Sequence, residues 1–211
     1  MYPKYSRTER IADGFVHATG VGLALIFSVI LLAYAPVELT LGHKLAVLVY
    51  NFTLVGMLFA SGIYHMTPWE SLRPLLRRID HAVIFVKIAG TFTPLVVLIN
   101  TPFAYGILAL VWALALSGAV KDLFFWRRPG RFGPFLYLGL AWIGVALIWP
   151  IFEISPRVGG FMVAGGLTYT VGVVFYKWDG LRYSRAIWHS FVLIASGFFF
   201  AAVASSLPIA A

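Results

Sequence analysis

Seven long apolar segments constrain the fold of this chain more than any other feature of its sequence. They cover approximately residues 15–36, 44–66, 80–100, 102–122, 134–153, 159–177 and 187–209. Each approaches the roughly 20 residues that a helix needs to cross the hydrocarbon core of a bilayer. Because lipid offers no hydrogen-bond partners to the backbone, such segments cross as helices. The sequence therefore predicts an all-α integral membrane protein, a seven-transmembrane helix bundle.

The composition supports a single membrane-embedded unit. Of the 211 residues, 61% are hydrophobic and 11% are charged, whereas soluble domains carry about 25% charged residues. We expect a cytoplasmic N-terminal arm over 1–14 and a transmembrane domain over 15–211. The arm has no apolar core followed by a cleavage site, so it is not typical of a cleaved signal peptide. The absence of cysteine excludes disulfides, thiolate metal ligands and a cysteine nucleophile.

Basic residues concentrate in the N-terminal arm and in every second connection between the apolar segments. These residues are Lys4, Arg7, Arg10, Arg73, Arg77, Arg78, Lys121, Arg127, Arg128, Arg131, Lys177, Arg182 and Arg185. The other connections contain only Lys44 and Arg157. The positive-inside rule then predicts a cytoplasmic N-terminus and, after seven crossings, an extracytoplasmic C-terminus. Because this bias accounts for the net charge of +8, we expect membrane lipids and no nucleic acid as partners.

Ionisable residues gather at the predicted cytoplasmic ends of the helices. Four of the five histidines lie there, and their polar neighbours follow at helical spacing. The resulting one-faced groups are Glu9, Asp13 and His17; Ser61 and His65; Asp80, Lys87 and Thr91; and Arg185, His189 and Ser196, with His81 beside Asp80. Ionisable groups at membrane depth are costly, so they are candidates for function. These groups could converge on one cavity, and imidazoles with a carboxylate suit a zinc ion.

Each of these residues also has a structural interpretation. Asp80 could cap a helix N-terminus, and His17 and His81 could lie in the headgroup zone. His65 and His189 follow aromatic residues and could be interfacial anchors. Lys87 lies too deep to reach the interface easily, so we expect it to pair with a carboxylate such as Asp80 or Asp13.

Five ordered motifs connect these residues to a known family. They are Glu9…Asp13…His17; Ser61-x-x-Tyr64-His65; Asp80-His81 leading into Ile88-Ala89-Gly90-Thr91-Phe92-Thr93-Pro94; Gly165-Gly166-x-x-Tyr169-Thr170-x-Gly172; and Ile187-Trp188-His189-x-Phe191-Val192-Leu193. Over nearly its whole length the chain resembles the bacterial hemolysin III family. That family is part of the superfamily of progestin and adipoQ receptors, which is related to the alkaline ceramidases.

The resemblance implies a location in the bacterial inner (plasma) membrane and a zinc site near its cytoplasmic face. The metal would be held by His65 and His189, and Asp80 would contact it through water or directly. Asp80 and Ser61 would be the catalytic residues. Related receptors are thought to hydrolyse lipid amides such as ceramide, and the bacterial members have been proposed to act in membrane-lipid homeostasis.

The chain departs from the family pattern at a ligand position, because Arg185 stands where the first histidine of an H-x-x-x-H pair is expected. A protonated guanidinium cannot bind a cation. Three outcomes follow for the metal. His65, His189 and Asp80 hold it; or His17 or His81 supplies the missing imidazole; or no metal binds and Arg185 takes the place of its charge. A smaller departure is Asp13, where asparagine is usual.

Three functions remain open from the sequence. The first is a metal-dependent intramembrane hydrolase of lipid amides or esters, or a related lipid-homeostasis factor. The second is a non-enzymatic receptor or regulator, in which Arg185, Lys87, His17, Asp13 and His81 line a cavity for a lipid or ligand. The third is a pore-forming cytolysin, which the polar residues favour least because they cluster on one side of the membrane.

Overall fold

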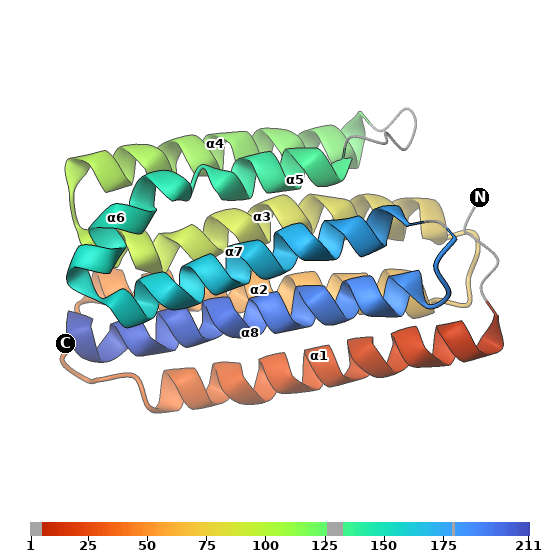
Figure 1. The fold of residues 1–211 in the computed structure, drawn as a ribbon, viewed down its shortest axis with the longest axis horizontal. Coiled ribbons are helices and arrows are strands. Elements are labelled where there is room, and N and C mark those ends of the chain that lie inside the picture. Colours follow the sequence, from red (N-terminus) through yellow and green to blue (C-terminus); the bar gives the residue numbers. More distant parts are fainter. Residues whose placement is uncertain (1–5, 126–132, 179) are drawn as a thin grey trace.

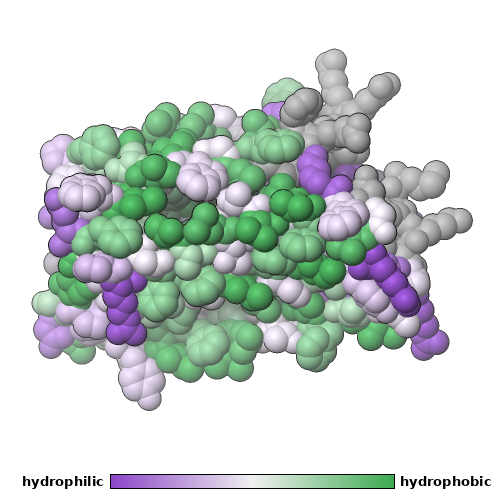
Figure 2. All heavy atoms as spheres, viewed as in Figure 1, coloured by the Kyte–Doolittle hydropathy of each residue, from purple (hydrophilic) through white to green (hydrophobic). Residues whose placement is uncertain are grey.

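A computed structural model describes residues 6–125, 133–178 and 180–211, and these residues form a bundle of helices (Figure 1). The helices are α1 (Arg7–Ala33), α2 (Leu41–Met66), α3 (Arg73–Ile99), α4 (Pro102–Phe124), α5 (Gly133–Trp142), α6 (Val145–Ile154), α7 (Pro156–Lys177) and α8 (Ser184–Ala210). Within these residues, six helices are long and apolar enough to cross a membrane, and α5 with α6 makes a seventh span if the bent pair is counted as one. Apolar residues cover the middle of the molecule, and hydrophilic ones lie towards its two ends (Figure 2). The chain is therefore a multi-pass membrane protein, and the predicted all-α membrane bundle is confirmed.

The first helix begins before the apolar segment over 15–36 and includes Glu9 and Asp13, which helical spacing grouped with His17. It is continuous from Arg7, so the expected boundary between an arm and a membrane domain at residue 14 lies inside α1. The cause is a capping box at Ser6. The Ser6 hydroxyl accepts from the Glu9 backbone N–H at 3.3 Å, and the Ser6 N–H donates to the Glu9 carboxylate at 2.9 Å. This start satisfies backbone donors that would otherwise be unpaired.

The predicted span over 134–153 is two helices. α5 ends at Trp142 and α6 begins at Val145, and the pair is bent by 40°. At the break, a side chain on Gly144 would come within 2.7 Å of the Phe92 ring of α3. Glycine therefore allows the bent segment to pack against α3, where it forms part of a cavity wall.

One end of the bundle brings together the starts of α1, α3 and α8 and the ends of α2, α4 and α7 (Figure 1). Arg7, Arg73, Lys121, Lys177 and Arg185 all belong to these helix ends. This is the basic side on which the orientation was predicted, and its cytoplasmic location stays a prediction. Four further basic residues of that prediction lie outside the described residues: Lys4, Arg127, Arg128 and Arg131.

Helix α3 occupies the centre of the bundle and contacts α2, α4, α5, α6 and α8. Small residues allow these helices to approach closely. Any side chain at Gly172 of α7 would come within 2.7 Å of the Phe191 Cβ of α8, and one at Gly90 of α3 would collide with Thr53 of α2. This packing places the polar faces of α2, α3, α7 and α8 around a common interior.

Candidate functional site

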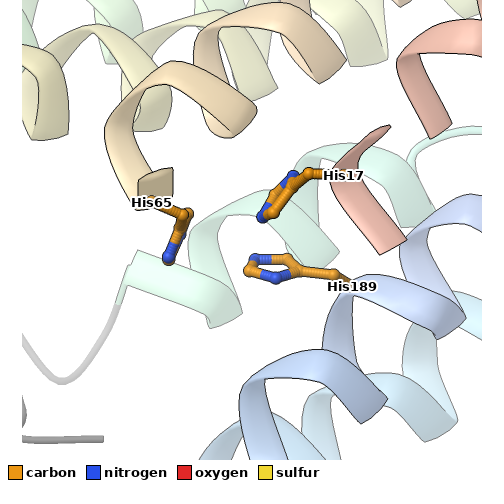
Figure 3. A group of neighbouring side chains, drawn as sticks. All are labelled: His17, His65 and His189. Atoms are coloured by element: carbon orange, nitrogen blue, oxygen red, sulfur yellow. The ribbon is translucent and has the colours of Figure 1, made fainter. Parts of the chain in front are cut away.

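Three histidines from three helices meet inside the bundle. His17 comes from α1, His65 from α2 and His189 from α8, and their side chains point toward one another (Figure 3). All three are buried, and one nitrogen from each lies within 4.8 Å of the others. The ring centroids of His17 and His189 are 4.3 Å apart, and those of His65 and His189 are 4.5 Å apart. We call these three residues the histidine cluster.

The helices that carry the histidine cluster are held together at their basic ends. The Glu9 carboxylate that caps α1 also accepts from the Tyr183 backbone N–H at 3.1 Å, which joins the start of α1 to the start of α8. Between α1 and α2, Gly62 lies beside His17, since a Cβ there would be in ordinary contact with the His17 Cβ at 3.8 Å. The Glu9 hydrogen bond therefore fixes the start of α1 against the start of α8.

A buried carboxylate orients the histidine cluster. Asp13 Oδ1 lies 2.5 Å from His189 Nδ1. Since an ionised carboxylate only accepts, the His189 Nδ1–H donates, and this leaves a lone pair on Nε2. Asp13 also lies 3.7 Å from His65 Nδ1 and 3.8 Å from His17 Nε2. Carboxylates in this position typically fix the tautomer and orientation of metal-binding imidazoles.

The donor set fits a metal ion. His17 Nε2 is buried and has no hydrogen-bond partner among the described residues. A buried imidazole nitrogen without a partner is costly, and a bound cation would accept its lone pair. Three imidazoles with an open fourth position are a ligand set of catalytic zinc and of related divalent ions. The histidine cluster could therefore hold a metal ion.

A cavity of about 650 Å³ opens beside the histidine cluster. The polar part of its wall includes Ser61, His65, Asp80, His81, Arg185 and His189. Asp80 accepts a hydrogen bond from Ser61 and lies close enough to His189 and Arg185 to interact with them electrostatically. Farther from the basic end, the wall is largely apolar and includes Phe92, Val145, Ile148 and Met162. A carboxylate, a hydroxyl and a candidate metal site thus border one space whose volume is that of a small-molecule binding pocket.

Comparison with known proteins decides the family. A family model described as "Haemolysin-III related" matches residues 5–200. The chain belongs to the hemolysin III family. It is 32% identical to Hemolysin-3 of Bacillus cereus over 194 residues, which cover 91% of this chain and 89% of that protein. It is 30% identical to the Hemolysin-3 homolog of Bacillus subtilis (strain 168) over 194 residues, 91% of each chain.

The family extends to animal proteins of the progestin and adipoQ receptor type. The human monocyte to macrophage differentiation factor is 24% identical over 204 residues, which cover 92% of this chain and 83% of that protein. The resemblance inferred from the five sequence motifs is therefore confirmed at the level of family and superfamily.

In this hemolysin III protein the structure brings together one of the three metal sets that the sequence left open. The nitrogens that lie within 4.8 Å of one another belong to His17, His65 and His189. Within the described residues, Asp80 is not part of that group of donors; it lies on the cavity side of His189. Arg185 precedes His189 by one helical turn, and its guanidinium lies 4.8 Å from the centre of the Tyr176 ring.

The other predicted cavity residues divide between two sides of the histidine cluster. Arg185, Lys87 and His81 line the cavity, whereas Asp13 borders a separate small pocket near Glu9. His17 is not among the residues of the cavity wall in the part of the chain that the structure describes. Of the histidine cluster, His65 and His189 therefore face the cavity, and Asp13 and His17 lie outside its wall.

Lys87 and His81 have partners that the sequence did not indicate. The Lys87 Nζ donates to the Tyr169 hydroxyl at 2.9 Å, and in the described part of the chain no carboxylate lies within ion-pair distance of it. His81 Nδ1 lies 3.1 Å from the Tyr137 hydroxyl, which donates to Asp122 at 3.3 Å. The expected pairing of Lys87 with Asp80 or Asp13 is wrong.

Tyr169 is the residue that sequence reasoning missed. Its motif supported the family resemblance, but the tyrosine was not assigned to the site. A buried lysine needs a polar partner, and a tyrosine one turn from a glycine pair on a mostly apolar helix was a candidate. The distance between Lys87 and Tyr169 along the chain hid the pairing.

Proposed function

We propose that this hemolysin III protein is a metal-dependent intramembrane hydrolase that cleaves amide or ester bonds in membrane lipids. The observation that carries the proposal is the position of the histidine cluster. It adjoins a cavity of about 650 Å³ with an apolar part, and the cavity wall also holds a hydrogen-bonded Asp80–Ser61 pair. Polar groups that a membrane protein keeps at this depth are costly, which favours a chemical role.

His17, His65 and His189 would hold the metal, and we propose zinc because its protein ligands are commonly imidazoles. A bound zinc ion would polarise the lipid carbonyl and make a water nucleophilic at neutral pH. Asp13 keeps the His189 Nδ1 protonated and its ring oriented, so that Nε2 keeps the lone pair with which it would bind the metal. Arg185 is not needed as a ligand in this arrangement, because His17 supplies the third imidazole.

Asp80 is the proposed general base and acid. It faces the cavity and would accept a proton from the attacking water, then return it to the leaving nitrogen or oxygen. Ser61 donates to the Asp80 carboxylate and fixes its position. The cavity wall would exclude bulk water from the scissile bond.

The lipid would enter with its polar group at the basic end of the bundle and its chains in the apolar part of the cavity. We place this end in the cytoplasm and the protein in the bacterial inner membrane, following the basic residues of its loops. The substrate would then come from the cytoplasmic leaflet. A role in membrane-lipid homeostasis follows from such an activity.

Turnover of labelled lipids by the purified protein tests the proposal. The protein in detergent micelles would be incubated with a fluorescent ceramide and a fluorescent acyl ester, and released fatty acid would be measured. We expect hydrolysis that a chelator abolishes and zinc restores. No release from either substrate by zinc-loaded protein would contradict the hydrolase.

A control separates the hydrolase from the receptor alternative. Co-purified lipid that is bound at the cavity and never turned over, in protein that retains its metal, would favour a non-enzymatic lipid-responsive regulator. The Asp80→Asn variant should bind the same lipid as the wild type but release no fatty acid.

A further inference from the structure

Lys87 is a buried cation that the proposed hydrolysis does not use. It lies on α3 seven residues beyond Asp80, which places it about 10 Å deeper in the bundle by helical rise. Its side chain is 4% exposed and lines the cavity. The residue therefore presents a positive charge to the interior of a membrane protein.

The groups around Lys87 compensate its charge only in part. The Nζ donates to the Tyr169 hydroxyl and lies 4.8 Å from the centre of the Tyr169 ring and 5.2 Å from that of Phe199. Aromatic faces attract a cation, but more weakly than an opposite charge does. Among the described residues no aspartate or glutamate forms an ion pair with it. An anionic group in the cavity would supply the opposite charge that these residues do not.

A small polar layer surrounds Lys87. The Tyr169 hydroxyl lies 2.9 Å from the Ser196 hydroxyl. Ser196 is seven residues from His189 on α8, just as Lys87 is seven residues from Asp80 on α3. Tyr50 is close enough to Tyr169 to interact with it electrostatically, and its buried hydroxyl has no hydrogen-bond partner among the described residues. We call Lys87, Tyr169 and Ser196 the lysine cluster.

The lysine cluster lies between the polar part and the apolar part of the cavity. On one side are His65, Asp80 and Arg185, and on the other are Phe92 and Met162. An amphiphile that fills this space puts its polar group beside Lys87 and its chain against the apolar wall. An ammonium with a neighbouring phenol suits a carboxylate or phosphate oxygen.

We propose that the lysine cluster is a binding site for the anionic group, a carboxylate or a phosphate, of a single-chain amphiphile. Lys87 supplies the charge and Tyr169 positions the Lys87 ammonium. The site lies about two turns from the histidine cluster, so it recognises a part of the ligand that is not hydrolysed. The inference concerns binding alone and does not require the proposed hydrolysis.

Matched acid and neutral probes test this site and distinguish the two anions. Binding of oleate would be compared with that of oleyl alcohol, and binding of lysophosphatidate with that of monooleoylglycerol, on purified protein in neutral detergent. We expect the wild type to bind at least one acid about tenfold or more tightly than its neutral partner. The pair that shows the preference identifies the anionic group.

Substitutions assign the preference to Lys87. Lys87→Met should bring the affinity ratio close to one, and Lys87→Arg should retain most of it. Lys121→Met removes the same charge from an exposed position outside the cavity and should leave the ratio unchanged. Methionine keeps a long unbranched side chain and removes the cost of burying a charge, so the variant should fold, and an unchanged metal content would verify this.

Two results would overturn the inference. One is a wild type that binds acids and neutral partners equally. The other is a preference that survives Lys87→Met and disappears in Arg185→Gln, because the anion would then bind at the basic end of the cavity. If the wild type prefers the acids but hydrolyses no lipid, the result counts against the hydrolase and supports the anion site at the lysine cluster.

Discussion

The histidine cluster and the lysine cluster occupy two depths of the same interior and have opposite chemistry. The histidine cluster offers lone pairs from three imidazoles and the charge of Asp13, and one of its nitrogens has no hydrogen-bond partner among the described residues. The lysine cluster offers donors: an ammonium and two hydroxyls in a continuous chain of hydrogen bonds. The first suits a cation, and the second suits an anion.

This difference indicates how a lipid would be oriented. The two clusters are each built on α8, with His189 and Ser196 two turns apart, so a ligand that fills the cavity meets both. Its reacting bond would lie beside His65 and Asp80, and a second polar group would lie beside Lys87. Because the histidine cluster suits a cation and the lysine cluster an anion, variants that change one cluster should leave the binding measured at the other intact.

The largest expected effect is on turnover. Asp80→Asn removes the proposed base and should lower lipid hydrolysis by about 10²- to 10⁴-fold, while the metal content and the affinity for anionic amphiphiles stay at wild-type values. Single-turnover release of fatty acid measures it. The matched control is the same substitution at Asp122. This buried carboxylate accepts a hydrogen bond from Tyr137 but is itself not part of the cavity wall. If both variants lost the same amount of hydrolysis, Asp80 would not be the general base.

The next effect is on the metal. Asp13→Ala removes the acceptor of the His189 Nδ1–H and should weaken metal affinity by about 10- to 100-fold. Asp13→Asn keeps an oxygen acceptor and should lie between this variant and the wild type. Competition with a chromogenic chelator measures both. A normal affinity in Asp13→Ala would show that the carboxylate does not support the histidine cluster.

A smaller effect is expected at the lysine cluster. Tyr169→Phe keeps the ring beneath the ammonium but removes one hydrogen bond, so the affinity for the preferred anionic amphiphile should fall about 2- to 10-fold. Metal affinity should not change. If the variant instead lost its metal, the two clusters would form one coupled site, and the claim that they bind separate groups would be wrong.

The smallest effect concerns the helix start that holds α1 in place. Ser6→Ala removes the cap of α1 and should lower the free energy of unfolding by about 1 kcal/mol, measured by thermal unfolding in detergent. Because the cap joins α1 to α8 through Glu9, the metal affinity should fall slightly and anion binding should not. A stability equal to that of the wild type would mean that the ends of the helices are fixed by packing alone.

Much of the fold could be predicted from the sequence because lipid leaves the backbone few options. Runs of apolar residues such as 44–66 correspond closely to α2, Leu41–Met66. The break between Trp142 and Val145 could not be predicted, since it depends on the contact of Gly144 with Phe92 from another helix. The early start of α1 had a local signal, the Ser6–Glu9 capping box, which the hydropathy of the segment obscured.

The candidate site was predicted in its residues but not in its grouping. Helical spacing put Asp13 and His17 on one face of α1, and helix depth put His17 beside His65 and His189. Spacing cannot tell which face turns toward which neighbour, so His17 was weighed equally with His81 as the missing imidazole. Packing decides this: the His17 ring stacks on the His65 ring of α2 with centroids 5.2 Å apart, whereas His81 contacts Tyr137. The partner of Lys87 could not be predicted for the same reason: Tyr169 is far away in the chain, and only the packing of the helices brings the two together.

Metal content of the purified protein tests the central proposal most directly. Inductively coupled plasma mass spectrometry would be applied to the wild type, to His17→Ala and to the His65→Ala/His189→Ala double variant after loading with zinc and desalting. We predict about one equivalent of zinc per chain in the wild type and less than about a tenth of that in both variants. A wild type that holds less than about a tenth of an equivalent, or a His17→Ala variant that holds a full one, would contradict the proposal that these three histidines form a metal site.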